Sequence, residues 1–300
     1  MKHAAMASAI LTLATFAVAQ QPAPATSTPA ATPAGQAATA AVPATGKRPP
    51  QAKTQPEFDA YNAAKAKAND PAAFEKATDD FATKFPDSEL TVLMYRDAMH
   101  AYQTANNADK MLDMGRKVLK LDKDDPEALI GVAEVLTERT RDTDLDKAQR
   151  MEEAVNDANR ALETIDTDIA VPPNTPQDRV DAYKSFLRSG AYAILGTQAF
   201  NANSFADAEK FFRKSIDAFA SQPDPVVVLR LALSMDKQNK YPEALKEANH
   251  AVELTQDTTS VGQLARRERD RLIQLTGGTV PAPATGTAPA TPASAAPAPK

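Results

Sequence analysis

The chain has 300 residues, with 34 Lys and Arg, 39 Asp and Glu, and no Cys. The lack of Cys excludes disulfides, zinc–thiolate sites, iron–sulfur clusters and thiol nucleophiles. A net charge of −5 argues against a protein that binds nucleic acid through phosphate contacts, because that affinity comes largely from basic residues. No Asp, Glu, Lys or Arg occurs in residues 3–46 or 276–299, so almost all the charge lies in the middle of the chain.

The first residues have the pattern of a secretory signal peptide. Lys2 gives a positive start, residues 4–16 are uncharged and mostly apolar, and Ala17-Val18-Ala19 fits the small-x-small cleavage rule. The apolar stretch is shorter than the roughly 20 residues that span a bilayer, and no Cys is present to carry a lipid. We expect cleavage after Ala19 and a mature protein that is exported to the periplasm or secreted, without a membrane span. The alternative is an anchor that stays attached.

Residues 20–55 and 277–300 are rich in Pro, Ala and Thr. They lack the large apolar side chains that would offset the entropy of ordering. We therefore expect a disordered linker before the charged region and a disordered tail after it. The simplest interpretation is that both are spacers, and the alternative is that they bind domains that recognise Pro-rich motifs.

Residues 56–276 are predicted to be all-α. Apolar residues recur at three- and four-residue spacing, which is the period of an amphipathic helix. Turn and breaker signals divide the region into about eleven helices, of which residues 176–202 form one long helix. The short links predict antiparallel hairpins. Two apolar stripes are Phe205, Ala208, Phe212, Ile216 and Phe219, and Tyr241, Ala244, Leu245, Ala248, Val252 and Leu254.

The hairpins share a pattern of small and large residues. Ala208-x3-Phe212-x2-Ser215 is matched by Ala244-x3-Ala248-x2-Ala251. In the preceding helix, Tyr192-x2-Leu195-Gly196-x2-Ala199 corresponds to Val228-x2-Leu231-Ala232-x2-Met235. A small residue at Gly196 would let paired helices approach closely, while Phe212 would fill the wider gap beside them.

This pattern resembles the tetratricopeptide repeat (TPR) family, whose helix–turn–helix unit is about 34 residues long. The resemblance covers nearly all of residues 56–276 and implies hairpins stacked as a right-handed solenoid. Two departures are the absence of the first-helix Trp and an insertion at residues 137–146. In the final helix, Val261, Leu264, Leu272 and Leu275 are expected to close the open end of the array.

The resemblance further implies a concave binding face made by the first helix of each hairpin. Family members that grip a C-terminal carboxylate use a Lys and an Asn four residues apart, and no such pair occurs at the matching positions. We therefore expect no recognition of chaperone tails. The other interpretation of this face is that the neighbouring helix buries Leu229 and Leu233. The implied partner-binding residues are Arg96, His100, Gln103, Ile130, Glu134, Thr197, Asn201, Leu229, Arg230, Leu233 and Lys237.

No catalytic, cofactor or metal motif is apparent. The chain has no H-E-x-x-H, G-x-S-x-G, P-loop or G-x-G-x-x-G pattern. Asp142, Asp144, Asp146 and Glu153 have the carboxylate spacing of a calcium loop, but Lys147 stands where that loop needs Gly. We expect a solvated loop in which Asp146 caps a helix that starts near Lys147, with calcium binding as the alternative.

Together these features predict a non-catalytic interaction scaffold of the bacterial cell envelope that binds a peptide or protein segment. One alternative is a component of an outer-membrane or cell-wall assembly complex. A more distant alternative is an enzyme with an unrecognised carboxylate site. No nucleic-acid partner and no cofactor is expected.

Overall fold

The described part of the chain consists of eleven helices, as the sequence predicts. The computed structural model describes residues 47–172 and 174–277. The predicted signal peptide, residues 20–46 of the predicted linker and residues 278–300 of the predicted tail lie outside these ranges. The helices are α1 (Gln55–Lys65), α2 (Pro71–Lys84), α3 (Leu90–Thr104), α4 (Ala108–Leu121), α5 (Pro126–Arg139), α6 (Lys147–Thr164), α7 (Gln177–Asn201), α8 (Phe205–Ala218), α9 (Pro225–Asp236), α10 (Tyr241–Glu253) and α11 (Ser260–Leu275).

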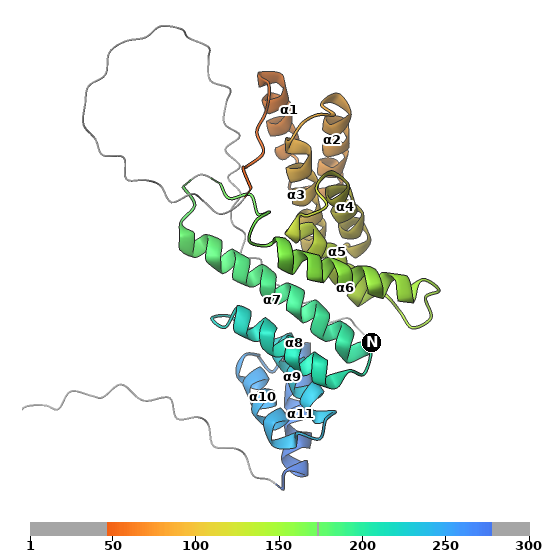
Figure 1. The fold of residues 1–300 in the computed structure, drawn as a ribbon, viewed down its shortest axis with the longest axis vertical. Helices are drawn as coiled ribbons and strands as arrows, with labels where there is room; N and C mark the ends of the chain where they lie inside the picture. The colour runs from red at the N-terminus through yellow and green to blue at the C-terminus, as the bar shows by residue number, and fades with distance from the viewer. Residues whose placement is uncertain (1–46, 173, 278–300) are drawn as a thin grey trace, which may run out of the picture.

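Consecutive helices pack as antiparallel hairpins that stack along one axis (Figure 1). The hairpins pair α1 with α2, α3 with α4, α5 with α6, α7 with α8, and α9 with α10. First helices also contact each other from one hairpin to the next, as α3 with α5, α5 with α7 and α7 with α9. The first helices of the first three hairpins, α1, α3 and α5, begin at Gln55, Leu90 and Pro126. The spacing between these starts is close to the roughly 34 residues of a TPR unit. The fold is a TPR-like helical solenoid.

Three of the hairpin turns have the same local structure. Asn106, Asn203 and Asn239 follow α3, α7 and α9, and their φ angles of 54°, 60° and 61° are left-handed. The residue after each Asn donates its backbone N–H to a carbonyl five residues back, at 2.9 to 3.0 Å. Asn tolerates the left-handed conformation better than most residues. The three Asn residues therefore allow the chain to reverse direction after α3, α7 and α9.

Side-chain caps begin several of the helices. Asp70, Asn107, Asp125, Asp224 and Thr259 each accept a hydrogen bond from a backbone N–H in the first turn of the helix that follows. In α2, α5 and α9 a Pro takes the first helical position, where a missing N–H costs nothing. The sequence signals Asn-Asp-Pro, Asp-Asp-Pro and Pro-Asp-Pro therefore mark helix starts correctly.

The close approach of α7 and α8 depends on Gly196. A Cβ added at Gly196 would lie 2.6 Å from two ring atoms of Phe212. The fully buried Phe212 ring therefore packs directly on the backbone of α7. This geometry confirms the predicted pairing of a small residue in the first helix with a large one in the second.

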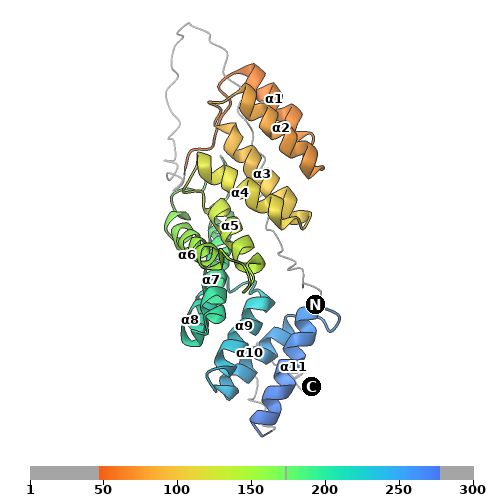
Figure 2. The same cartoon turned by 90° about the vertical axis from the view of Figure 1, so that its right-hand side faces the viewer.

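The last helix covers the end of the array with a narrower stripe than expected. Gly262, Ala265 and Leu272 are buried against α9 and α10. Leu264 and Leu275 are 47% and 49% exposed, so their predicted place in the closing stripe is wrong. The physical reason is that no further hairpin of the described residues lies beside α11, so only one side of its apolar surface is covered. Figure 2 shows α11 at the end of the stack.

The insertion between α5 and α6 forms a solvated loop. Helix α6 begins at Lys147 as predicted, but the Asp146 side chain makes no cap hydrogen bond and accepts one from Arg150 Nε at 2.7 Å instead. Lys147 Nζ donates to Asp142 at 2.8 Å, and Asp144 accepts from the Arg141 backbone N–H at 2.9 Å. The carboxylates with calcium-loop spacing thus turn to separate donors. Among the described residues, no group of three or more His, Asp or Glu is arranged to hold a metal.

Candidate partner-binding face

The first helices α3, α5, α7 and α9 contact one another from hairpin to hairpin, and the side of the array that they form is here called the inner face. Along α5, the residues Glu127, Ile130, Glu134 and Glu138 are spaced by three and four positions, so they share one helix face. Ile130 is half-buried and packs against Leu187 and its apolar neighbours on α7. The three glutamates of this stripe meet quite different surroundings.

The first turn of α5 lies in a dense ionic network with α3. The Arg96 guanidinium contacts Asp125, which is buried, and lies 3.4 Å from Glu127. Burial works against the charged guanidinium, but Asp125 and Glu127 outweigh it and raise the pKa of Arg96. Arg96 therefore serves as a structural cation that joins two hairpins, and its predicted role in partner binding stays a prediction.

Glu127 has two further neighbours on the inner face. His100 Nε2 lies 3.3 Å from its second carboxylate oxygen, and the Tyr183 hydroxyl donates a hydrogen bond to it. Tyr183 is half-buried, and this burial together with Glu127 raises its pKa well above the ordinary value. Residues from α3 and α7 thus engage Glu127 together.

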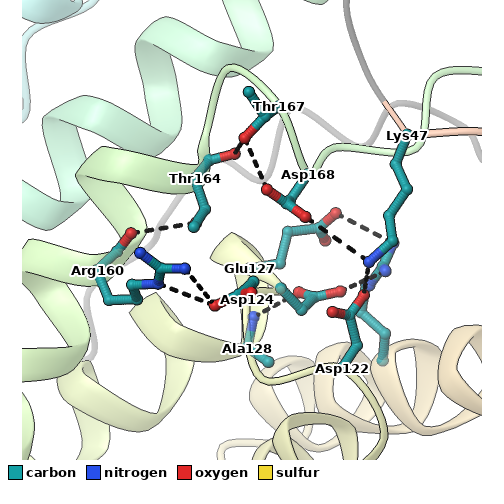
Figure 3. A network of polar contacts seen from close by, with 11 residues as sticks. Lys47, Asp122, Asp124, Glu127, Ala128, Arg160, Thr164, Thr167 and Asp168 are labelled. Atoms are coloured by element: carbon teal, nitrogen blue, oxygen red, sulfur yellow. Dashed lines mark hydrogen bonds and ion pairs between the residues drawn. The ribbon is translucent and has the colours of Figure 1, made fainter.

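The loop before α5 ties several elements together (Figure 3). Asp122 accepts a hydrogen bond from Lys47 Nζ at 2.6 Å, and Asp124 accepts one from Arg160 of α6 at 2.9 Å. Asp125 binds Arg96 and also caps α5 by accepting from the Ala128 N–H at 2.9 Å. Three carboxylates within four residues therefore hold cations from three different parts of the chain.

Glu134, two turns further along α5, lies in a different setting. Its polar contact is a long hydrogen bond of 3.4 Å from Gln103 Nε2, and no Lys, Arg or His nitrogen of the described chain lies within 4 Å. Desolvation is the main cause that raises the pKa of Glu134 to about 7, and Glu138 and Asp224 add to the effect. The side chain is only partly exposed. Glu134 is therefore a carboxylate without a cation on the inner face.

Arg230 of α9 lies near these acids but is engaged elsewhere. Its guanidinium donates to Thr197 Oγ1 at 2.8 Å, and Thr197 donates to the Ala193 carbonyl. Burial lowers the pKa of Arg230, and Glu138 and Asp224 oppose that shift. The predicted residues Thr197 and Arg230 are thus brought together by α7 and α9. Arg230 donates its hydrogen bond to Thr197 and makes no ion pair with Glu134 in the described chain.

The apolar part of the predicted face is mostly covered. Leu229 is 5% exposed and packs with Val228, Ala251 and Ala265, and Leu233 is partly buried against the same cluster. Because α10 and α11 cover this side of α9, the prediction that Leu229 lines an open face is wrong. Asn201 and Lys237 are both exposed, at the ends of α7 and α9.

The predicted set lacks five residues that surround Arg96, Glu134 or Arg230: Asp125, Glu127, Glu138, Tyr183 and Asp224. Glu127 and Glu138 could have been found, since the same stripe that selects Ile130 and Glu134 passes through both. Asp125 and Asp224 carry a capping signal, which gives no hint of a second role. Tyr183 lies in the part of α7 that precedes the repeat pattern, so no repeat position points to it.

No protein-family model and no curated protein matches the sequence. Among solved structures, the chain is similar to a thermophilic TPR protein from Thermus thermophilus, with 14% identity, 72% of this chain and 99% of that chain covered, and a TM-score of 0.40. It is similar to residues 1–338 of an assembly chaperone of RpL4, with 10% identity, coverage of 74% and 98%, and a TM-score of 0.40. A third similar structure is a tetratricopeptide repeat protein from Parabacteroides merdae, with 12% identity, coverage of 73% and 88%, and a TM-score of 0.38.

None of the helices in the described ranges is both long and apolar enough to cross a membrane.

Proposed function

We propose that the chain is a non-catalytic interaction scaffold whose inner face binds an extended protein segment, with a basic side chain of that segment at Glu134. The observation that carries this proposal is Glu134 itself. It is a partly buried carboxylate on the inner face, and its hydrogen-bond partner in the described chain is a neutral amide. Such a group is destabilised until a cation or a proton reaches it.

The surrounding charges favour a cationic ligand over an anionic one. Glu138 and Asp224 lie close enough to raise the pKa of Glu134, and Arg230 is engaged by Thr197. A lysine ammonium or an arginine guanidinium at Glu134 would gain a charge-assisted hydrogen bond in a partly desolvated place. A C-terminal carboxylate would meet three acids there, in keeping with the missing carboxylate clamp.

Crosslinking tests this function directly. A photoreactive residue would replace Asn201, which is exposed at the inner-face end of α7, and Glu152, exposed on the second helix α6, would be the matched control. We expect protein adducts from position 201 that position 152 does not give. Glu134→Lys should abolish these adducts while the helical circular dichroism stays unchanged. Identical adducts from both positions, or adducts that survive Glu134→Lys, would contradict the proposal.

The proposed place of action is the bacterial cell envelope. This part of the proposal rests on the sequence alone, from the signal-peptide pattern of residues 1–19 and the absence of Cys for a lipid anchor. The mature protein should begin at Gln20 and be released with the periplasmic or secreted fraction. Mass spectrometry of the protein from each fraction checks this, and an intact chain starting at Met1 in the cytoplasm would argue against export.

A further inference from the structure

Residues 47–53, here called the strap, lie outside the helices and run along one edge of the array. The strap falls inside the segment that the composition predicts as a disordered linker, yet it contacts the chain along its length. The edge that it follows consists of the loops that enter α3, α5 and α7, here called the loop edge and defined as residues 85–89, 122–125 and 165–170. The strap thus passes the first three junctions between hairpins.

The beginning of the strap binds the third junction and the second. The Lys47 backbone N–H donates to the Ile169 carbonyl at 3.1 Å, and Lys47 forms a parallel β-bridge with Ala170. Lys47 Nζ lies 2.6 Å from Asp122 and 3.7 Å from Asp168 (Figure 3). One lysine therefore joins two loops that are far apart in sequence.

The rest of the strap binds the first junction. Arg48 Nη2 donates to both oxygens of Glu89, at 2.8 and 2.7 Å, and the Gln51 backbone N–H donates to the same carboxylate at 3.3 Å. Lys53 Nζ donates to the Asp87 carbonyl at 2.5 Å, and its backbone N–H donates to Glu57 at 2.6 Å. Between these contacts, Pro49-Pro50 keeps the backbone extended and Ala52 packs on the apolar core of the first hairpins.

These contacts have the character of peptide recognition. An extended segment gives backbone N–H groups to the surface, and basic side chains at both of its ends meet acids or carbonyls that the loops present. We propose that the loop edge is a binding surface for an extended basic segment, and that residues 47–53 occupy it in cis. This surface uses neither Glu134 nor Arg230, although its Asp125 also binds Arg96 of the inner face.

The strap is held on the loop edge weakly enough for another segment to displace it. The ion pairs of the strap are partly open to solvent, with the side chains of Lys47 and Arg48 45% and 60% exposed, and exposed ion pairs are weak. The local concentration of the attached segment, more than the strength of any one contact, keeps it in place. A segment of the same chemistry supplied at high concentration should therefore compete.

Hydrogen exchange tests the occupancy in the full chain. The backbone amides of Lys47, Gln51 and Lys53 should exchange at least tenfold more slowly than in an unstructured peptide of the same sequence. The triple variant Lys47→Glu/Arg48→Glu/Lys53→Glu should lose this protection with unchanged helical circular dichroism, because none of the three side chains lies within a helix. The charge swap Arg48→Glu/Glu89→Arg should restore more protection than either single change. Free exchange in the unaltered chain would overturn the proposal.

Binding in trans tests the surface itself. A fluorescent peptide of residues 45–54 should bind the triple variant at least tenfold more tightly than the unaltered chain, whose edge is already occupied. A peptide with all three bases changed to Glu is the control and should not bind. Equal binding to both proteins, or none to the triple variant, would refute the binding surface. Sedimentation of the unaltered chain should show a monomer, and a dimer that dissociates in the triple variant would overturn occupancy in cis.

Discussion

Two glutamates on the same stripe of α5, seven residues apart, have opposite roles. Glu127 is surrounded by Arg96, His100 and Tyr183, and with Asp125 it forms part of the structure that joins successive hairpins. Glu134 faces the neutral Gln103 and the acids Glu138 and Asp224. A negative charge on the inner face therefore does not by itself set the role of a residue. That role depends on whether a neighbouring helix places a cation beside it.

The largest loss of stability is expected from removing Arg96, the cation beside Glu127. Arg96→Ala leaves Asp125 buried without its partner, which should destabilise the protein by about 3–5 kcal/mol. The matched control is Arg116→Ala, which removes a more exposed pair with Glu153 and should cost less than about 1 kcal/mol. Urea unfolding of both variants gives the two values. Equal losses would mean that the Arg96 network contributes no more than a surface ion pair.

A smaller effect separates the two glutamates themselves. Glu127→Gln weakens charge-assisted hydrogen bonds to Arg96 and Tyr183 and should cost about 1.5–3 kcal/mol. Glu134→Gln removes an ionised carboxylate that has no cation and should increase stability at pH 8. Chemical denaturation at that pH compares them. If Glu134→Gln proved the more damaging of the two, the contrast between the sites would be lost.

The pH dependence of stability sharpens the same contrast. The folded protein holds a proton on Glu134 up to about pH 7, whereas the unfolded chain releases it near the ordinary pKa of 4.5. Because the folded state binds more protons in this range, Glu134 makes stability fall as the pH rises from about 5 to about 7. The melting temperature of Glu134→Gln should decline less over this range than that of the unaltered protein. Parallel declines would show that Glu134 titrates normally.

The smallest effect is expected at His100. Its imidazole is about one-third exposed and adds to a Glu127 carboxylate that Arg96 and Tyr183 already engage. His100→Gln should therefore change stability by less than about 1 kcal/mol, as for exposed ion pairs. Thermal melts at neutral pH measure this. A loss as large as that of Glu127→Gln would make His100 a main partner of the glutamate.

The helical array could be predicted from the sequence because its signals are local. Asn in three of the hairpin turns, Asp-Pro at three helix starts, and a glycine opposite a phenylalanine each act within a short stretch or one hairpin. Glu134 is selected through the resemblance to the TPR family, whose binding positions also lie within one helix. The helix bounds and the small-to-large packing therefore follow from neighbouring residues.

The roles of charged residues could not be predicted, because they depend on contacts between hairpins. Asp125 and Arg96 are 29 residues apart, and only the stacking of α5 on α3 makes them a pair. Residues 47–53 have the composition of a linker, and their acidic partners lie as far away as Asp122 and Asp168. Leu264 and Leu275 have the spacing of a buried stripe, but no other helix of the described ranges covers them.

The proposed function depends on Glu134 being a carboxylate that is available to a cation of the partner. Carbon-13 NMR of its carboxyl group tests this, with the signal assigned by its loss in Glu134→Gln and followed over pH. We expect the titration midpoint of the Glu134 carboxyl group to lie at about pH 7 in the free protein. It should fall by at least one pH unit when a lysine-bearing peptide saturates the inner face. A midpoint near 4.5 in the free protein, or one that the peptide does not move, would contradict it.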